Sequence, residues 1–150
     1  MNVLIVYESK YGNTQKVAEL ISEGMKIGEG HEISIENVNE IDLSKSNFYD
    51  LILIGSPNHM GGPTKTVKKF IDKLSESPLK GKSYAVFDTY MKKDEGKAVK
   101  KMETRISKKL PDLRKLSSGL SIKVGGMKGP IVEEDIPKCK EFGEQLLKQP

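Results

Sequence analysis

Hydroxyl and amide side chains gather in a short glycine-containing segment near the N-terminus. Ser9, Asn13 and Thr14 surround Gly12, directly after the apolar run 2–7 and before a stretch with helical spacing. Glycine permits a tight turn, hydroxyl and amide groups donate hydrogen bonds, and the first N–H groups of a helix attract an anion. The pattern therefore predicts a phosphate-binding loop. A helix N-cap formed by Asn13 or Thr14, with no ligand, is the alternative interpretation.

A second segment, rich in glycine and proline, follows the apolar run 50–55. It reads Gly55-Ser56-Pro57-Asn58-His59-Met60-Gly61-Gly62-Pro63-Thr64. Glycine and proline at this density indicate a fixed turn whose backbone a ligand can approach closely. A plain connector that starts a helix near Pro63 and Thr64 is the alternative.

Five apolar runs alternate with stretches of helical spacing, which is typical of parallel strands joined by helices in an α/β fold. The expected strands are 2–7, 32–38, 50–55, 83–89 and 119–124. Helical spacing appears around Val17–Met25, Val67–Leu74, Val99–Leu110 and Ile136–Leu146, whereas 39–49 predicts only a short helix or an irregular crossover. Ligands of such sheets bind beyond the carboxyl ends of the strands. The segments after the first, third and fourth strands are therefore the candidate site.

Length and composition limit the classes of protein that this chain can belong to. A chain of 150 residues fits a single domain, 1–150, and no run approaches the ~20 apolar residues of a membrane span. The opening residues lack the features of a signal peptide, so we expect a cytoplasmic protein. The single cysteine, Cys139, forms no intramolecular disulfide and is expected to pack in the core. No cluster of residues suggests a metal site.

The two glycine-containing loops resemble those of the flavodoxin family. Ser9, Gly12, Asn13 and Thr14 match the phosphate loop of that family, and 55–64 resembles the second flavin-binding loop of its short members. The resemblance implies a flavodoxin-like, doubly wound, five-stranded parallel sheet with helices on both faces and strand order 2-1-3-4-5. It also implies that the cofactor is flavin mononucleotide (FMN). The first loop contains no Gly-Lys-Ser/Thr and the sequence contains no Gly-x-Gly-x-x-Gly pattern, so it predicts neither a Walker loop nor a dinucleotide-binding turn.

The resemblance assigns FMN binding to three loops. The expected cofactor-binding residues are Ser9, Lys10, Tyr11, Gly12, Asn13, Thr14, Ser56, Pro57, Asn58, His59, Met60, Gly61, Gly62, Asp88, Thr89 and Tyr90. Ser56 is expected to contact the phosphate or the ribityl chain. The backbone at Met60 and Gly61 is expected to lie against the reactive edge of the isoalloxazine ring, where its peptide rotates when the flavin takes up an electron. Tyr90 is expected to stack on the ring, with an exposed loop tyrosine as the alternative.

The chain departs from many flavodoxins in two respects. It contains no tryptophan, so His59 or Met60 takes the place of an aromatic ring in the second loop. The third loop continues into Lys92 and Lys93 instead of acidic residues. Because positive charge favours a reduced, anionic flavin, we expect a less strongly reducing carrier than typical members of the family.

Three functions are compatible with the sequence. The leading hypothesis is an FMN-dependent electron carrier that shuttles electrons between redox partner proteins and has no catalytic side chain of its own. The alternative is an FMN-dependent NAD(P)H:quinone-type reductase, so the sequence leaves open whether the chain is an enzyme. A flavodoxin-like interaction module without FMN, including a nucleic-acid-binding one, is the least favoured because the basic stretch carries no interleaved aromatic residue.

The charge of the chain suggests what its partner is like. The formal net charge is +4, and residues 91–115 hold ten basic side chains against four acidic ones. A basic face beside the flavin fits an acidic redox partner such as a ferredoxin. A merely solvated helix surface is the alternative.

Overall fold

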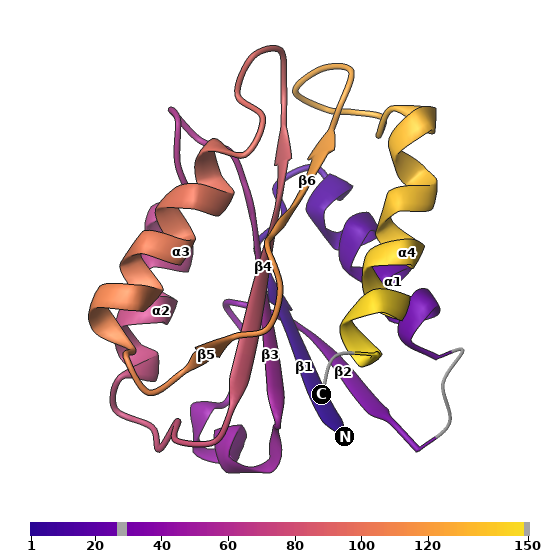
Figure 1. Ribbon diagram of the computed structural model, residues 1–150. Coiled ribbons are helices and arrows are strands. Elements are labelled where there is room, and N and C mark those ends of the chain that lie inside the picture. The colour runs from indigo at the N-terminus through magenta and orange to yellow at the C-terminus, as the bar shows by residue number, and fades with distance from the viewer. Residues whose placement is uncertain (27–29, 149–150) are drawn as a thin grey trace.

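The computed structural model, in which residues 1–26 and 30–148 are described, has a parallel sheet as its central layer (Figure 1). The strands are β1 (Asn2–Tyr7), β2 (Glu32–Asn37), β3 (Leu51–Pro57), β4 (Ser83–Tyr90), β5 (Arg114–Lys115) and β6 (Leu120–Lys123). Their order is β2-β1-β3-β4-β5, and β6 also pairs with β4. All of these pairings are parallel. The α/β class and the strand order predicted from the sequence are confirmed.

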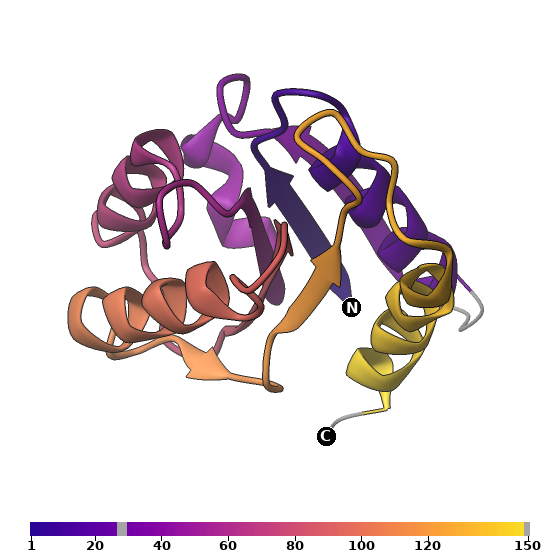
Figure 2. The same cartoon turned by 90° about the horizontal axis from the view of Figure 1, so that it is seen from above.

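Helices cover both faces of the sheet, as Figures 1 and 2 show from two directions. The α-helices are α1 (Asn13–Met25), α2 (Lys65–Leu74), α3 (Lys97–Lys109) and α4 (Ile136–Leu147). Two short 3₁₀ helices, η1 (Leu43–Phe48) and η2 (Glu133–Asp135), complete the described elements. Helices α1 and α4 pack on one face, and α2 and α3 pack on the other. The stretch 39–49 thus contains a short 3₁₀ helix, in line with the prediction.

Alternate residues of each strand supply two separate cores. In β1, Val3 and Ile5 face α1 and α4, whereas Leu4 and Val6 face α2 and α3. The reason is the two-residue period of a strand, in which successive side chains point to opposite faces. The same alternation sends neighbouring residues at the end of β4 to opposite sides of the sheet.

The fifth position of the sheet is divided, whereas the sequence predicted one continuous strand over 119–124. Tyr84 of β4 is in register with Lys115, and Phe87 is in register with Leu120. Residues 85–86 of β4 therefore lie opposite residues 116–119, so the edge carries extra residues, as in a β-bulge. A Cβ on Gly119 would lie 2.5 Å from Val99 Cγ1, so the returning chain packs tightly against α3.

Helices α1 and α4 touch through their backbones. A Cβ on Gly143 would lie 2.2 Å from the carbonyl oxygen of Ile21, and one on Gly24 would lie 2.1 Å from that of Lys140. Only glycine permits this approach. Cys139 on the same face of α4 is fully buried, and burial raises the pKa of its thiol to about 12. The expectation that Cys139 packs in the core is confirmed.

Replacing Gly143 with alanine should destabilise the protein by about 1 to 3 kcal/mol, because the new methyl group forces α1 and α4 apart. Helix propensity alone would make the same change stabilising. Urea unfolding of Gly143→Ala measures the effect, and Glu141→Ala at an exposed position of α4 is the control. Equal stabilities of the two variants would contradict the proposed close contact.

Candidate functional site

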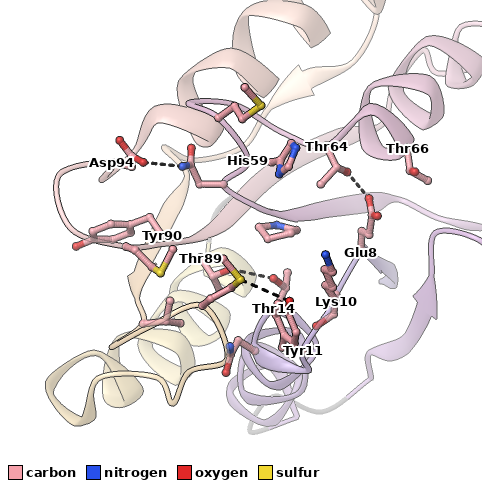
Figure 3. A pocket seen from close by; sticks show the side chains of 18 of the residues that line it. Glu8, Lys10, Tyr11, Thr14, His59, Thr64, Thr66, Thr89, Tyr90 and Asp94 are labelled. Atoms are coloured by element: carbon pink, nitrogen blue, oxygen red, sulfur yellow. Dashed lines mark hydrogen bonds between the residues drawn. The ribbon is translucent and has the colours of Figure 1, made fainter.

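A cavity with a volume of about 670 Å³ opens beyond the carboxyl ends of the strands (Figure 3). Of the residues predicted to form the site, those that line it are Ser9, Lys10, Tyr11, Asn13, Thr14, Pro57, Asn58, His59, Met60, Thr89 and Tyr90. The other predicted residues, Gly12, Ser56, Gly61, Gly62 and Asp88, are not among its lining residues. The structure thus brings the three predicted loops together around one space.

The first loop presents the uncapped start of α1. Gly12 is the N-cap residue, with a φ of 92°, and no side chain caps the helix. The N-cap interpretation of Asn13 or Thr14 is therefore wrong, since both residues lie inside α1. The first N–H groups of a helix have no partners within it, so this end of the cavity is suited to an anion. Ser9 Oγ accepts a hydrogen bond from Gly12 N–H at 3.0 Å, which leaves the hydroxyl proton of Ser9 to be donated elsewhere.

The second loop ends in a tight turn. His59 N–H donates to the carbonyl oxygen of Gly62 at 2.7 Å, and Gly62 N–H donates back to that of His59 at 3.2 Å. The central residues Met60 and Gly61 have φ values of 51° and 81°. Positive φ at both central positions is the signature of a type I′ turn. The turn exposes 91% of Met60 at the rim of the cavity.

Ser56 stabilises the second loop from inside and does not line the cavity. Its side chain is fully buried; its hydroxyl donates to the carbonyl oxygen of Pro57 at 2.9 Å and accepts from Thr64 N–H at 3.1 Å. Thr64 in turn caps α2 by accepting from Val67 N–H at 3.3 Å, and its hydroxyl donates to the carboxylate of Glu8. These bonds hold the start of α2 against the end of β1.

The third loop is controlled by two neighbours in β4. Thr89 faces α1, where its hydroxyl lies 2.9 Å from that of the buried Thr14. Asp88 faces the opposite side, where its carboxylate accepts from Val99 N–H at 3.0 Å and from the hydroxyl of Ser121. Burial raises the pKa of Asp88 to about 6, and these hydrogen bonds partly offset that effect. Asp88 thus positions α3 and the loop before it from behind the cavity.

Tyr90 lines the cavity and is only 8% exposed. The alternative of an exposed loop tyrosine is wrong. Burial raises the pKa of its phenol above the ordinary value of 10.0, at which a phenol is already uncharged at neutral pH. Figure 3 shows Tyr90 and Asp94 at one end of the cavity and Glu8, Thr64 and Thr66 at the other.

Hydrogen bonds join the second loop to the third. Asn58 N–H donates to the carbonyl oxygen of Thr89 at 2.7 Å, and the side-chain amide of Asn58 donates to Asp94 at 2.9 Å. Lys97 Nζ lies 2.9 Å from the other carboxylate oxygen of Asp94. The hydrogen bond from Lys97 is the main reason that the pKa of Asp94 is lowered. The two loops therefore form one connected wall.

Several lining residues were not predicted from the sequence. They are Glu8, Thr64, Lys65, Thr66, Met91, Asp94, Val124 and Met127. Val124 and Met127 belong to a fourth segment after β6, and the rule that ligands bind beyond strand ends could have identified it. The hydroxyl of Tyr11 donates to Met127 Sδ at 3.5 Å, which brings this segment onto the first loop.

Two parts of the cavity differ in chemistry. The start of α1 offers N–H and hydroxyl groups, whereas Met60, Tyr90 and Met91 offer apolar and aromatic surface. This arrangement suits a flat aromatic molecule that carries a phosphate. Among residues 1–26 and 30–148, no three or more His, Cys, Asp or Glu side chains are grouped to hold a metal ion. Within the same ranges, no helix has the length and apolar character needed to cross a membrane.

Comparisons with known proteins agree with this geometry. A family model described as a flavodoxin domain matches residues 4–121. A flavodoxin of Clostridium saccharobutylicum is 36% identical over 89 residues, which are 59% of this chain and 56% of that protein. The chain therefore spans about half the length of this curated relative. An NAD(P)H dehydrogenase (quinone) of Archaeoglobus fulgidus is 28% identical over 114 residues, 57% of this chain and 59% of that protein.

A solved structure extends the likeness to the whole chain. Oxidised flavodoxin 2 from Bacillus cereus superimposes with a TM-score of 0.83 and 28% identity, covering 99% of both chains. The fold is thus shared over nearly the full length of both chains.

Asp88 should make stability depend on pH between 7 and 5. Its folded pKa of about 6 lies above the usual 3.8, so the folded state binds the proton more tightly and gains stability as pH falls through 6. We expect the free energy of unfolding to rise by about 1 kcal/mol from pH 7 to 5, relative to Asp88→Asn. Urea titrations at both pH values measure this difference. Asp94→Asn, whose carboxyl has a lowered pKa, should keep the pH response of the wild type; the same response in Asp88→Asn would contradict the assignment.

Proposed function

The chain belongs to the flavodoxin family, and on this premise we propose that it carries electrons between redox proteins through FMN bound in the cavity. FMN is the cofactor that flavodoxins bind, and when bound it supplies reversible uptake of electrons. The observation that carries the proposal is the uncapped start of α1 and the aromatic wall at Tyr90 within one cavity.

The residues present fit FMN. The N–H groups at the start of α1, with the hydroxyls of Ser9 and Thr14, would hold the phosphate without a dedicated arginine. Burial of Tyr90 beside Met91 and opposite the His59–Gly62 turn would enclose the isoalloxazine ring and exclude water from it. Ser56 and Asp88 would act indirectly, by fixing the loops.

The acidic groups beside the cavity are already engaged, which supports a carrier over an enzyme with a general base. Glu8 accepts from the hydroxyl of Thr64, and Asp94 accepts from Asn58 and pairs with Lys97. Both carboxylates stabilise loops. Electron transfer needs no further proton-transfer group of the protein.

The partner is proposed to be an acidic redox protein. Lys92 and Lys93 are exposed, directly after the lining residue Met91 and before Asp94. Their charge would attract an acidic surface and bring it close to the flavin.

A second candidate function is an FMN-dependent NAD(P)H:quinone reductase, which the similarity to the Archaeoglobus fulgidus protein favours. Steady-state oxidation of NADPH by a quinone, with the FMN-loaded protein, distinguishes the two functions. Rapid turnover would favour the reductase, and its absence together with fast transfer between proteins would favour the carrier. The single domain over 1–150 and the cytoplasmic location stay predictions.

The phosphate site should make FMN bind much more tightly than riboflavin. Thr14→Ala removes a buried hydroxyl at this site and should weaken FMN binding by about 1 to 3 kcal/mol, with a smaller effect on riboflavin. Quenching of flavin fluorescence measures both affinities. Thr14→Ser keeps the hydroxyl and should largely restore FMN binding. Equal losses for FMN and riboflavin would argue against a phosphate at Thr14.

Electron transfer to an acidic ferredoxin should slow as salt rises past about 0.1 M, where the Debye length is ~10 Å. Charge reversal by Lys92→Glu with Lys93→Glu should lower the second-order rate in stopped-flow experiments and leave FMN bound. The matched control is Lys108→Glu with Lys109→Glu at the far end of α3, which should change the rate much less. Rates that change neither with salt nor with the substitutions of Lys92 and Lys93 would show that the partner docks elsewhere.

A further inference from the structure

Lys101 of α3 lies across the turn at Met60–Gly62. A Cβ on Gly62 would lie 3.0 Å from Lys101 Cδ and 3.7 Å from its Nζ, and a Cβ on Gly61 would lie 3.9 Å from Nζ. The absence of side chains at these two glycines gives the aliphatic stem its place on the turn. The ammonium group lies beside Gly61, although Lys101 is exposed to solvent and α3 begins more than thirty positions later in the sequence.

The positive charge of Lys101 has no carboxylate partner within the part of the chain that the structure describes. None of the ion pairs found among residues 1–26 and 30–148 involves Lys101. Acidic groups of the neighbouring segments have other partners: Asp94, before α3, pairs with Lys97 at 2.9 Å, and Asp72 of α2 pairs with Arg105 at 2.6 Å. Lys101 does not line the cavity, so its charge would act on a bound molecule from behind the turn.

The ring of a bound flavin would lie against the turn on which Lys101 packs. A phosphate at the start of α1 leaves the space between His59, Met60 and Tyr90 for the isoalloxazine. The turn that carries Lys101 on its outer side is one wall of that space. This step rests on the proposed function, because it requires FMN in the cavity.

We infer that the charge of Lys101 makes the cavity bind fully reduced FMN more tightly, relative to oxidised FMN, than it would without that charge. An isoalloxazine that has taken up two electrons from a reduced partner protein and one proton from solvent carries one negative charge, whereas the oxidised ring is neutral. A positive charge behind the turn stabilises the negatively charged ring and not the neutral one. It thus raises the reduction potential of the bound flavin and does not contribute to the affinity for the oxidised form.

The test compares affinities for the two oxidation states of FMN in three variants. Lys101→Met keeps an unbranched apolar stem and removes the charge, and Lys101→Arg keeps the charge. Lys100→Met removes the charge of the adjacent residue of α3, which is exposed as Lys101 is. Fluorescence quenching gives the Kd for oxidised FMN. The potentials of bound and free FMN, measured against reference dyes, then give the Kd for reduced FMN.

Lys101→Met should weaken binding of reduced FMN roughly threefold to tenfold and leave the Kd for oxidised FMN nearly unchanged. Lys101→Arg should behave as the wild type, and Lys100→Met should change the ratio of the two Kd values by less than about twofold. Higher salt should reduce the difference between Lys101→Met and wild type only in part, because the turn shields one side of the ammonium group.

Two results would overturn the inference while leaving the proposed function intact. If Lys101→Met weakened the binding of oxidised and of reduced FMN equally, the side chain would only pack on Gly62. If Lys100→Met changed the ratio of the Kd values for oxidised and reduced FMN as much as Lys101→Met, the general charge of α3 would account for the effect. A wild-type chain that binds neither form of FMN would contradict the proposed function itself, and the inference with it.

Discussion

The cavity depends on how the central strand β4 ends. Its side chains are buried along the whole strand, so it cannot move without disturbing both cores. At its end, Thr89 reaches α1 on one face, and Asp88 reaches α3 and β6 on the other. Two adjacent residues thus tie the first loop, the third loop and the sheet edge to one rigid strand. Asp88 and Thr89 therefore fix how the loops around the cavity are placed relative to one another.

The parts of the fold that repeat a simple period could be predicted from the sequence. Continuous apolar runs marked β1, β3 and β4, because strands buried on both faces leave no polar alternation. Gly12 marked the turn into α1, where its positive φ is used. Because parallel strands end at one edge of the sheet, the meeting of the three loops could also be predicted from the sequence. The break between β5 and β6 could not be predicted from the sequence, because it depends on the space left beside Val99.

The direction of individual side chains could not be read from the loops. Ser56 has the residue type of a ligand contact, but a neighbouring carbonyl and the Thr64 N–H already occupy its hydroxyl. Asp88 lies beside a cavity residue in sequence and on the other face of the sheet in space. Lys101 shows the reverse case: it lies on the exposed face of α3, and it contacts a turn forty residues away. Such relationships arise only when separate elements pack.

The divided fifth position has a consequence for the solution behaviour of the chain. An uninterrupted edge strand offers a row of free N–H and carbonyl groups on which another sheet can grow. Here the edge is split into β5, of two residues, and β6, of four, with an irregular segment between them. On the opposite edge, β2 carries Glu32 and Glu36. Neither border of the sheet is therefore a long, uncharged template, and the chain is protected from edge-to-edge aggregation.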